Sequence, residues 1–350
     1  MKKIVSLIFC IALTVCSAFA QRPAFDSKNP DVHDPVMAKG EDGRYYIFST
    51  GMGISVMSSD DRSTWRQEPS VFKFPEGIPQ WASDSIRGFK GHIWAPDIQK
   101  VNGKWYLYYS ISTFGKNRSA IGLATNKTLD PNSPDFKWED QGMVIASHQH
   151  QDNWNAIDPN LAIDQKTKTP YLVFGSFWDG IQIVKLAKDL KTPIGQPRTI
   201  ARKLGKKLTL AEVDDPSTWT IEGGDTIEAG ENAIEAPFII YKEGYYYLFV
   251  STDYCCRGQN STYKTVYGRS KNITGPYVDH NSKDMAFGGG MVIAEPDTNY
   301  FGIGHCSAYE FGSDWYFVSH GYSKADNGRA KLFLHPLDFS MGQWINLRDY

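Results

Sequence analysis

The chain has few cysteines and no strong charge of either sign. Five cysteines occur among 350 residues, and two of them, Cys10 and Cys16, lie close to the N-terminus, which excludes a disulfide-dense scaffold. The absence of CxxC and HExxH spacings argues against a zinc site. With a formal net charge of −2, the chain also lacks the basic surface that binds nucleic acid, so we expect no nucleic-acid partner.

Long apolar runs are missing after the N-terminus, which predicts no transmembrane segment. The N-terminus begins Met1-Lys2-Lys3, continues with a mostly apolar stretch over residues 4–15 and then reaches Ala18-Phe19-Ala20. A basic start, a short apolar core and an A-x-A site are typical of a secretory signal peptide, here residues 1–20. We therefore expect a secreted protein, periplasmic or extracellular. Cleavage before Cys16, which would give a lipid-anchored surface form, is the alternative.

Adjacent cysteines at positions 255 and 256 leave two interpretations open. In an oxidising compartment, Cys255 and Cys256 can form a strained vicinal disulfide. They can equally be two reduced, packed thiols. Cys306 is the remaining cysteine of the mature chain.

Aromatic residues are abundant, at 10 Trp, 19 Tyr and 19 Phe, and they recur in a pattern. A β-rich core accounts for most of them. Each aromatic segment follows a short extended segment and a polar or glycine-bearing turn such as Asn102-Gly103. This order is a hairpin signal. The aromatic segments are residues 43–48, 103–108, 170–174, 244–249 and 314–318, and the segments before them are residues 35–38, 97–101, 160–164, 238–242 and 307–311.

A third, alternating segment follows each hairpin, and a fourth short strand with a tryptophan or tyrosine often comes next. Four-stranded units that repeat around an axis make a β-propeller. The sequence therefore predicts an all-β fold, with residues 21–350 forming one five-bladed β-propeller, and we expect a monomer. The third segments are residues 53–57, 120–124, 181–184, 265–269 and 330–334, and the aromatic residues of the fourth strands are Trp65, Trp138, Tyr277 and Trp344.

Residues 193–225 carry no strong pattern. We interpret them as an insertion or loop after the third blade. The rival architecture is a two-domain β-sandwich protein, which does not explain five similar units.

Three acidic residues lie at the same place in the repeat. Asp34 in VHDPV, Asp158 in NAIDPN and Glu235 in AIEAPF each stand at or just before the first strand of a unit, ahead of a proline or an Ala-Pro pair. First strands line the channel of a propeller, so their beginnings meet at one mouth. The same place in the other two units carries residues 94–97 (Trp-Ala-Pro-Asp) and His305. Gathered carboxylates repel one another and raise at least one pKa, as an acid–base site for glycoside hydrolysis requires.

The segments VHDPV, HIWAPDI, WNAIDPN, AIEAPFI and GIGHCS, together with TFGKNRSAIGLA, resemble glycoside hydrolase family forty-three, most closely its endo-α-1,5-L-arabinanases. The resemblance covers nearly the whole mature chain. It implies a five-bladed propeller that cleaves a glycosidic bond with inversion of the anomeric centre. On this resemblance we expect Asp34 to be the general base and Glu235 the general acid. Asp158 is expected to raise the pKa of the acid and to orient it.

The resemblance also implies a metal and substrate contacts. His305 matches the family histidine near the propeller axis, which helps to hold a calcium ion largely surrounded by water; sodium or chloride and a packed core histidine are the alternatives. Trp94 is expected to stack on a sugar ring or to be a structural tryptophan. The residues matched to substrate contacts are Trp94, Phe114, Gly115, Asn155, Ser176, Phe177 and Trp178.

The expected activity is endo-hydrolysis of α-1,5-L-arabinofuranosidic linkages in arabinan and arabino-oligosaccharides. The alternatives on the same fold are an exo-arabinanase, an α-L-arabinofuranosidase and a β-xylosidase. Many such relatives carry a further C-terminal sandwich domain, whereas this sequence ends soon after the fifth repeat, which favours an arabinanase. An inactive sugar-binding propeller is the non-enzymatic alternative. It is expected to lack one of the three carboxylates, and all three are present.

Overall fold

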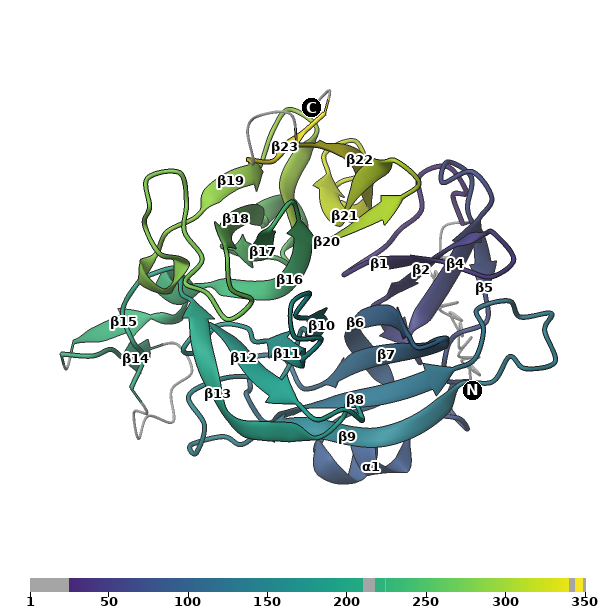
Figure 1. Cartoon of the computed structure of the whole chain (residues 1–350), viewed down its shortest axis with the longest axis horizontal. Coiled ribbons are helices and arrows are strands. Elements are labelled where there is room, and N and C mark those ends of the chain that lie inside the picture. Colours follow the sequence, from purple (N-terminus) through teal and green to yellow (C-terminus); the bar gives the residue numbers. More distant parts are fainter. Residues whose placement is uncertain (1–24, 210–217, 224, 340–343, 349–350) are drawn as a thin grey trace, which may run out of the picture.

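The computed structural model describes residues 25–209, 218–223, 225–339 and 344–348. The predicted signal peptide, Cys10 and Cys16 therefore lie outside the described residues. Five small sheets stand around a central axis, which confirms the predicted five-bladed propeller (Figure 1). The helices of the described ranges are short, and none of them could cross a membrane. They are α1 (Gln80–Ser85) and the 3-10 helices η1 (Ala229–Asn232), η2 (Gly258–Asn260) and η3 (Met285–Phe287).

Each blade contains four strands that follow one another outward from the axis (Figure 1). Blade 1 is β1 (Val36–Lys39), β2 (Tyr45–Ser49), β4 (Ser55–Ser59) and β5 (Arg66–Glu68). Blade 2 is β6 (His92–Val101), β7 (Lys104–Ile111), β8 (Ser119–Asn126) and β9 (Glu139–Ser147), with β3 (Gly51–Met52) on the edge of β6. Blade 3 is β10 (Asn160–Ile163), β11 (Pro170–Phe174), β12 (Ile181–Leu186) and β13 (Pro193–Ala201).

The last two blades follow the same order. Blade 4 is β16 (Ile234–Lys242), β17 (Tyr245–Thr252), β18 (Lys264–Ser270) and β19 (Met291–Ala294). Blade 5 is β20 (Tyr300–Phe311), β21 (Asp314–Ser323), β22 (Arg329–Asp338) and β23 (Asn346–Leu347). A small sheet of β14 (Thr218–Thr220) and β15 (Thr226–Glu228) lies between blades 3 and 4 in the chain.

The prediction of an insertion or loop over residues 193–225 is wrong in its first part. Residues 193–201 form β13, the outer strand of blade 3, and pair with β12. This strand contains two prolines and is mostly not buried, so it lacks the alternation that reveals a half-buried strand. The rest of the segment, including β14 and β15, is an insertion, and residues 210–217 and 224 lie outside the described ones.

The aromatic residues assigned to the fourth strands lie just outside them. Trp65, Trp138 and Trp344 come shortly before β5, β9 and β23. Tyr277 is further away, because the fourth strand of blade 4 begins only at Met291. The Tyr277 ring is fully buried between blades 3 and 4, and its hydroxyl donates to the carbonyl of Ile273 (2.5 Å). Tyr277 is therefore a core residue in the connection between β18 and β19, and not a residue of the fourth strand.

Apolar packing between blades holds the ring together. Five apolar clusters of the described residues each join one blade to the next, for example Tyr108 of β7 with Leu172 of β11. The ring is closed by residues 30–32 along β22 of blade 5, where the Val32 amide donates to the Ala330 carbonyl (3.1 Å). Burying both faces of each blade in this way is what a small twisted sheet requires.

One residue near the start of every blade has a left-handed backbone. These are Asp34 (φ 54°), Ala95 (φ 41°), Asp158 (φ 58°), Ala236 (φ 55°) and His305 (φ 55°). The first four precede a proline, which has no amide to donate to a neighbouring strand. In β6, β16 and β20 the pairing register shifts at this point. We call this repeated bend the inner-strand bend.

A side chain accepts the amide hydrogen of each bent residue. In four blades this acceptor comes from the end of the second strand of the preceding blade, or from just after it. The four pairs are Ala95 with Thr50 Oγ1 (2.8 Å), Asp158 with Ser110 Oγ (2.9 Å), His305 with Ser251 Oγ (2.7 Å) and Asp34 with His320 Nδ1 (3.1 Å). At Ala236 the acceptor is the Asp158 carboxylate (3.1 Å). Left-handed non-glycine residues persist only when their surroundings hold them, and these bonds do so.

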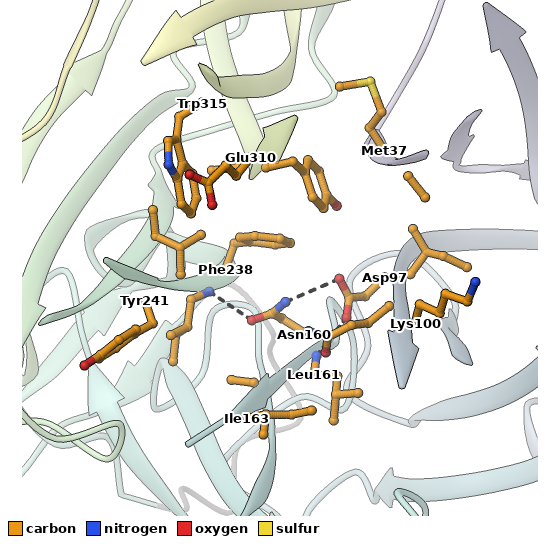
Figure 2. Close-up of a pocket in the computed structure, with 18 of the residues that line it drawn as sticks. Met37, Asp97, Lys100, Asn160, Leu161, Ile163, Phe238, Tyr241, Glu310 and Trp315 are labelled. Atoms are coloured by element: carbon orange, nitrogen blue, oxygen red, sulfur yellow. Dashed lines mark hydrogen bonds between the residues drawn. The ribbon is translucent and has the colours of Figure 1, made fainter. Parts of the chain in front are cut away.

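Further along the inner strands, polar side chains join neighbouring blades. Asp97 of β6 accepts the Leu161 amide of β10 (2.7 Å) and the Asn160 side chain (3.3 Å), and Asn160 accepts the Ile239 amide of β16 (2.9 Å) (Figure 2). Burial raises the pKa of Asp97 to about 7. The cavity of about 640 Å³ at this level is lined by the later residues of the inner strands, so it lies beyond the inner-strand bends. None of the three predicted carboxylates lines it.

Asp97→Ala should lower the free energy of unfolding by about 3 kcal/mol, because it leaves the Leu161 amide and the Asn160 side chain unpaired in a buried place. Asp97→Asn keeps an acceptor oxygen and should cost only about 1 kcal/mol. Urea denaturation of the three proteins at neutral pH measures both values. Equal stability of Asp97→Ala and the parent protein would show that this contact does not hold the blades.

Candidate active site

The inner-strand bends bring the three predicted carboxylates to one end of the central channel. Asp34 and Asp158 are themselves bent residues, and Glu235 directly precedes one. All three are buried, with exposed fractions of 7%, 7% and 8%. Each of the three is close enough to His305 to change its pKa. The predicted gathering of Asp34, Asp158, Glu235 and His305 is therefore present.

Asp34 is surrounded by hydrogen-bond donors. The Thr50 hydroxyl donates to Oδ2 (2.5 Å), His33 Nδ1 lies 2.8 Å from Oδ2, and His305 Nδ1 lies 3.0 Å from Oδ1. Burial opposes ionisation of Asp34, but the attraction of His305 and, after it, of His33 outweighs burial. They hold the pKa of Asp34 well below its usual range. Asp34 is therefore an ionised carboxylate at neutral pH.

Asp158 and Glu235 form a second group. The hydroxyls of Tyr263 and Ser176 donate to Glu235 Oε1 (2.7 Å) and Oε2 (2.8 Å). Asp158 accepts the amide of Ala236, the residue directly after Glu235. The position of Asp158 is thus tied to the backbone that carries Glu235.

The electrostatics of this group are opposite to those of Asp34. Burial raises the pKa of Asp158, His305 opposes this, and the charge of Glu235 raises it again. Burial also raises the pKa of Glu235, against the hydrogen bonds of Tyr263 and Ser176. Two interacting carboxyls give up their protons as a pair. The pair therefore keeps a proton at a pH where ordinary carboxyls are ionised.

The surroundings of His305 favour a positive charge, which is either a proton on its ring or a bound cation. Burial lowers the pKa of His305, but the charge of Asp34 and its hydrogen bond outweigh burial and raise it to about 9. In the described part of the chain, the cluster of three side chains with candidate ligand atoms within 4.8 Å of one another is His33, Asp34 and His320, without His305. A cation at His305 would have to replace the ring proton and would take most of its ligands from water, in a field of carboxylates that favours positive charge.

Sequence reasoning missed Tyr263, His320 and Tyr322. His320 is fully buried and holds the Asp34 amide, and Tyr263 donates to Glu235. A signal for His320 exists in the repeat. It has the same place in its blade as Ser110 and Ser251, because each pairs with the residue just before a bend. A polar residue ending each aromatic strand could have indicated this role.

The predicted substrate contacts have different surroundings. Ser176 touches Glu235, as described above. Trp94 is half-buried, and its Nε1 donates to His92 Nδ1 (3.0 Å). Asn155 is buried, and its Oδ1 has no hydrogen-bond partner among the described residues. Phe114 is 82% exposed. Gly115 has a φ of 73°, which favours glycine, although an added Cβ would meet nothing within 4 Å.

Phe177 and Trp178 face the insertion after β13. Both are left-handed (φ 55° and 37°) and partly buried, and they pack against Leu208, Ile221 and Ile227. The Phe177 amide donates to the carbonyl of residue 234 in β16 (2.8 Å). These contacts place the insertion beside Ser176, the hydrogen-bond partner of Glu235.

The structure resolves the alternatives for the adjacent cysteines. Cys255 and Cys256 are joined by a vicinal disulfide. The Cys256 amide donates to the Tyr322 hydroxyl (2.7 Å), so the disulfide lies beside the histidines that surround Asp34. Cys306 is a buried free thiol.

The profile of Glycosyl hydrolases family 43 matches residues 28–345. The chain belongs to this family. Family membership and the buried carboxylate cluster together identify a glycoside hydrolase.

Relatives of known name agree with this assignment. The extracellular exo-α-(1→5)-L-arabinofuranosidase ArbA of Cellvibrio japonicus is 44% identical over 92% of this chain and 87% of its own. The extracellular endo-α-(1→5)-L-arabinanase 1 of Bacillus subtilis is 39% identical over 96% and 92%. An exo-1,5-α-L-arabinanase from a bovine ruminal metagenomic library has a solved structure with a TM-score of 0.84 and 58% identity, covering 93% of this chain and 100% of its own. The arabinohexaose complex of the Cellvibrio cellulosa α-L-arabinanase has a TM-score of 0.82 and 43% identity, covering 92% and 96%.

Proposed function

We propose that this glycoside hydrolase cleaves α-1,5-L-arabinofuranosidic linkages of arabinan and arabino-oligosaccharides with inversion at the anomeric carbon. The observation that carries the proposal is the electrostatic division of the site. One buried carboxylate, Asp34, is kept ionised, while the Asp158–Glu235 pair keeps a proton. An inverting glycosidase needs this combination of a base and an acid. The names of the relatives support arabinan as the substrate.

In this mechanism Asp34 accepts a proton from the water that attacks the anomeric carbon, since it is ionised and held by Thr50 and the two histidines. Glu235 gives its proton to the departing glycosidic oxygen, and Tyr263 and Ser176 hold its carboxyl in place. The proton of the pair is shared, and when Glu235 carries it, the negative charge then left on Asp158 keeps it there until the bond breaks.

We propose exo-acting cleavage, with endo-acting cleavage as the second candidate. Two of the compared relatives, at 44% and 58% identity, bear exo names, whereas the relative at 39% identity bears an endo name. The insertion after β13 also supports the exo mode. It packs against Phe177 and Trp178 next to the partner of Glu235, so it adds chain beside the proposed general acid.

We propose calcium as the ion at His305, bound largely through water. When bound, the ion would add positive charge to the cluster and strengthen the field that keeps Asp34 ionised.

We also propose export, since the compared relatives from Cellvibrio japonicus and Bacillus subtilis are named extracellular. N-terminal sequencing of the exported protein distinguishes cleavage after Ala20 from cleavage before Cys16.

Glu235→Gln should lower kcat on linear arabinan by about 10³-fold, because it removes the general acid, while binding of arabino-oligosaccharide stays near the parent value. Initial rates and calorimetry measure the two quantities. Glu243→Gln, in the turn at the far end of the same hairpin, is the control and should leave both unchanged. An inactive sugar-binding propeller would bind the oligosaccharide but show no turnover in any of the three proteins.

Exo-acting cleavage should release one small sugar from linear arabinan from the first minutes, with a slow fall in viscosity. Size-resolved product analysis beside viscometry measures this, and debranched and branched arabinan compared in parallel show whether side chains stop the enzyme. A ladder of oligosaccharides with an early loss of viscosity would establish the endo mode instead.

Purified protein should contain calcium, and a chelator should lower its melting temperature until calcium is restored, because a ligand that binds only the folded state stabilises it. Elemental analysis and thermal melts measure this, with magnesium and sodium added back as controls. Absence of calcium together with an unchanged melting temperature would count against the calcium site. Recovery with sodium alone would point to that ion.

A further inference from the structure

The Tyr322 hydroxyl joins the two histidines that flank Asp34. It lies 2.7 Å from the Cys256 amide nitrogen, 2.9 Å from His33 Nε2 and 3.2 Å from His320 Nε2. We propose that Tyr322 is a positioning residue for Asp34, whose hydroxyl fixes the tautomers of both histidines. This inference rests on the proposed role of Asp34 as the base, and it assigns a task to a tyrosine outside the carboxylate cluster.

The tautomer of His320 follows from the Asp34 backbone. The Asp34 amide donates to His320 Nδ1 (3.1 Å), so that nitrogen carries a lone pair and no hydrogen. His320 is fully buried, and this burial lowers its pKa well below the usual value. The neutral ring therefore has its hydrogen on Nε2, which points at the Tyr322 hydroxyl.

The direction of the Tyr322 hydroxyl follows from its neighbours. Its oxygen accepts hydrogens from the Cys256 amide and from His320 Nε2, so its own hydrogen needs another acceptor. Ser261 also contacts this hydroxyl, and its Oγ already accepts the Arg257 amide (3.1 Å). His33 Nε2 lies 2.9 Å from the hydroxyl oxygen and has no other close donor, so we take it as the acceptor. Tyr322 then donates to His33 Nε2, which leaves the ring hydrogen of His33 on Nδ1.

This tautomer decides whether His33 presents an N–H group or a nitrogen lone pair to Asp34. His33 Nδ1 lies 2.8 Å from Asp34 Oδ2. His33 Nδ1 makes no well-aligned hydrogen bond, so its contact with Asp34 is mainly electrostatic. With the hydrogen on Nδ1, His33 attracts the carboxylate. In the other tautomer a lone pair would face the carboxylate at the same distance and repel it.

Packing keeps the three rings in place. His33 stacks on His320 with ring centroids 4.1 Å apart, and the Tyr263 ring stacks on His320 with centroids 5.8 Å apart. Tyr322 is 3% exposed. The Cys255–Cys256 disulfide braces the segment that supplies the Cys256 amide.

Nitrogen-15 spectra of histidine-labelled parent protein at neutral pH read the tautomers directly, with His33→Asn and His320→Asn identifying the signals. The expected result is hydrogen on Nδ1 of His33 and on Nε2 of His320. Hydrogen on Nε2 of His33 in the parent protein would overturn the proposal. Because the spectra need no substrate, they stand even if arabinan is not hydrolysed, and the two proposals fail separately.

Tyr322→Phe should lower kcat about 10- to 100-fold with KM changed by about twofold at most, because a misplaced base slows the chemical step. The control is Tyr267→Phe, which loses another buried tyrosine hydroxyl, bonded to the backbone of residue 345, and should keep the parent kcat.

A double-mutant cycle with His33→Asn distinguishes the proposed role of Tyr322 from a purely structural one. An asparagine amide can present an N–H to Asp34 without depending on Tyr322, so adding Tyr322→Phe to it should cost less than about threefold in kcat. An equal cost of Tyr322→Phe in both backgrounds would overturn the proposal.

Discussion

The left-handed bend at the start of every blade is the constraint on which this site depends. Each bent residue gives up a regular strand conformation, and a side chain, most often from the preceding blade, accepts its amide hydrogen. The bend turns side chains of neighbouring inner strands toward the axis at one end of the channel. Ring closure by apolar packing brings five such bends together, and three of them supply the carboxylates.

The junction between blades 3 and 4 departs from the pattern, and the departure has a chemical consequence. Here the Asp158 carboxylate accepts the amide hydrogen of Ala236, and Ser176, the second residue after β11, donates to Glu235. In the other blades the equivalent hydrogen bond only supports the bend. Here it also couples Asp158 to Glu235. On the other side, histidines surround Asp34 and favour its charge. One repeated backbone feature therefore carries two opposite electrostatic environments.

The sequence allowed the fold and the cluster to be predicted because both repeat. The aromatic hairpins gave the five blades, and the Asp-Pro and Ala-Pro positions gave Asp34, Asp158 and Glu235. β13 was missed because an exposed outer strand with two prolines has no alternation. Tyr263 and Tyr322 were missed because their partners are far away in the chain, so only the folded ring brings them together. The contacts of Phe177 and Trp178 with the insertion depend on tertiary packing in the same way.

The pH dependence of kcat/KM on linear arabinan, over the range in which circular dichroism shows the folded protein, tests the division between Asp34 and the Asp158–Glu235 pair most directly. The lowered pKa of Asp34 predicts that the acidic limb lies below the usual range of a carboxyl group. The raised pKa values of Asp158 and Glu235 predict that activity falls on the alkaline side only above that range. A profile whose two limbs both lie within the ordinary carboxyl range would contradict the account.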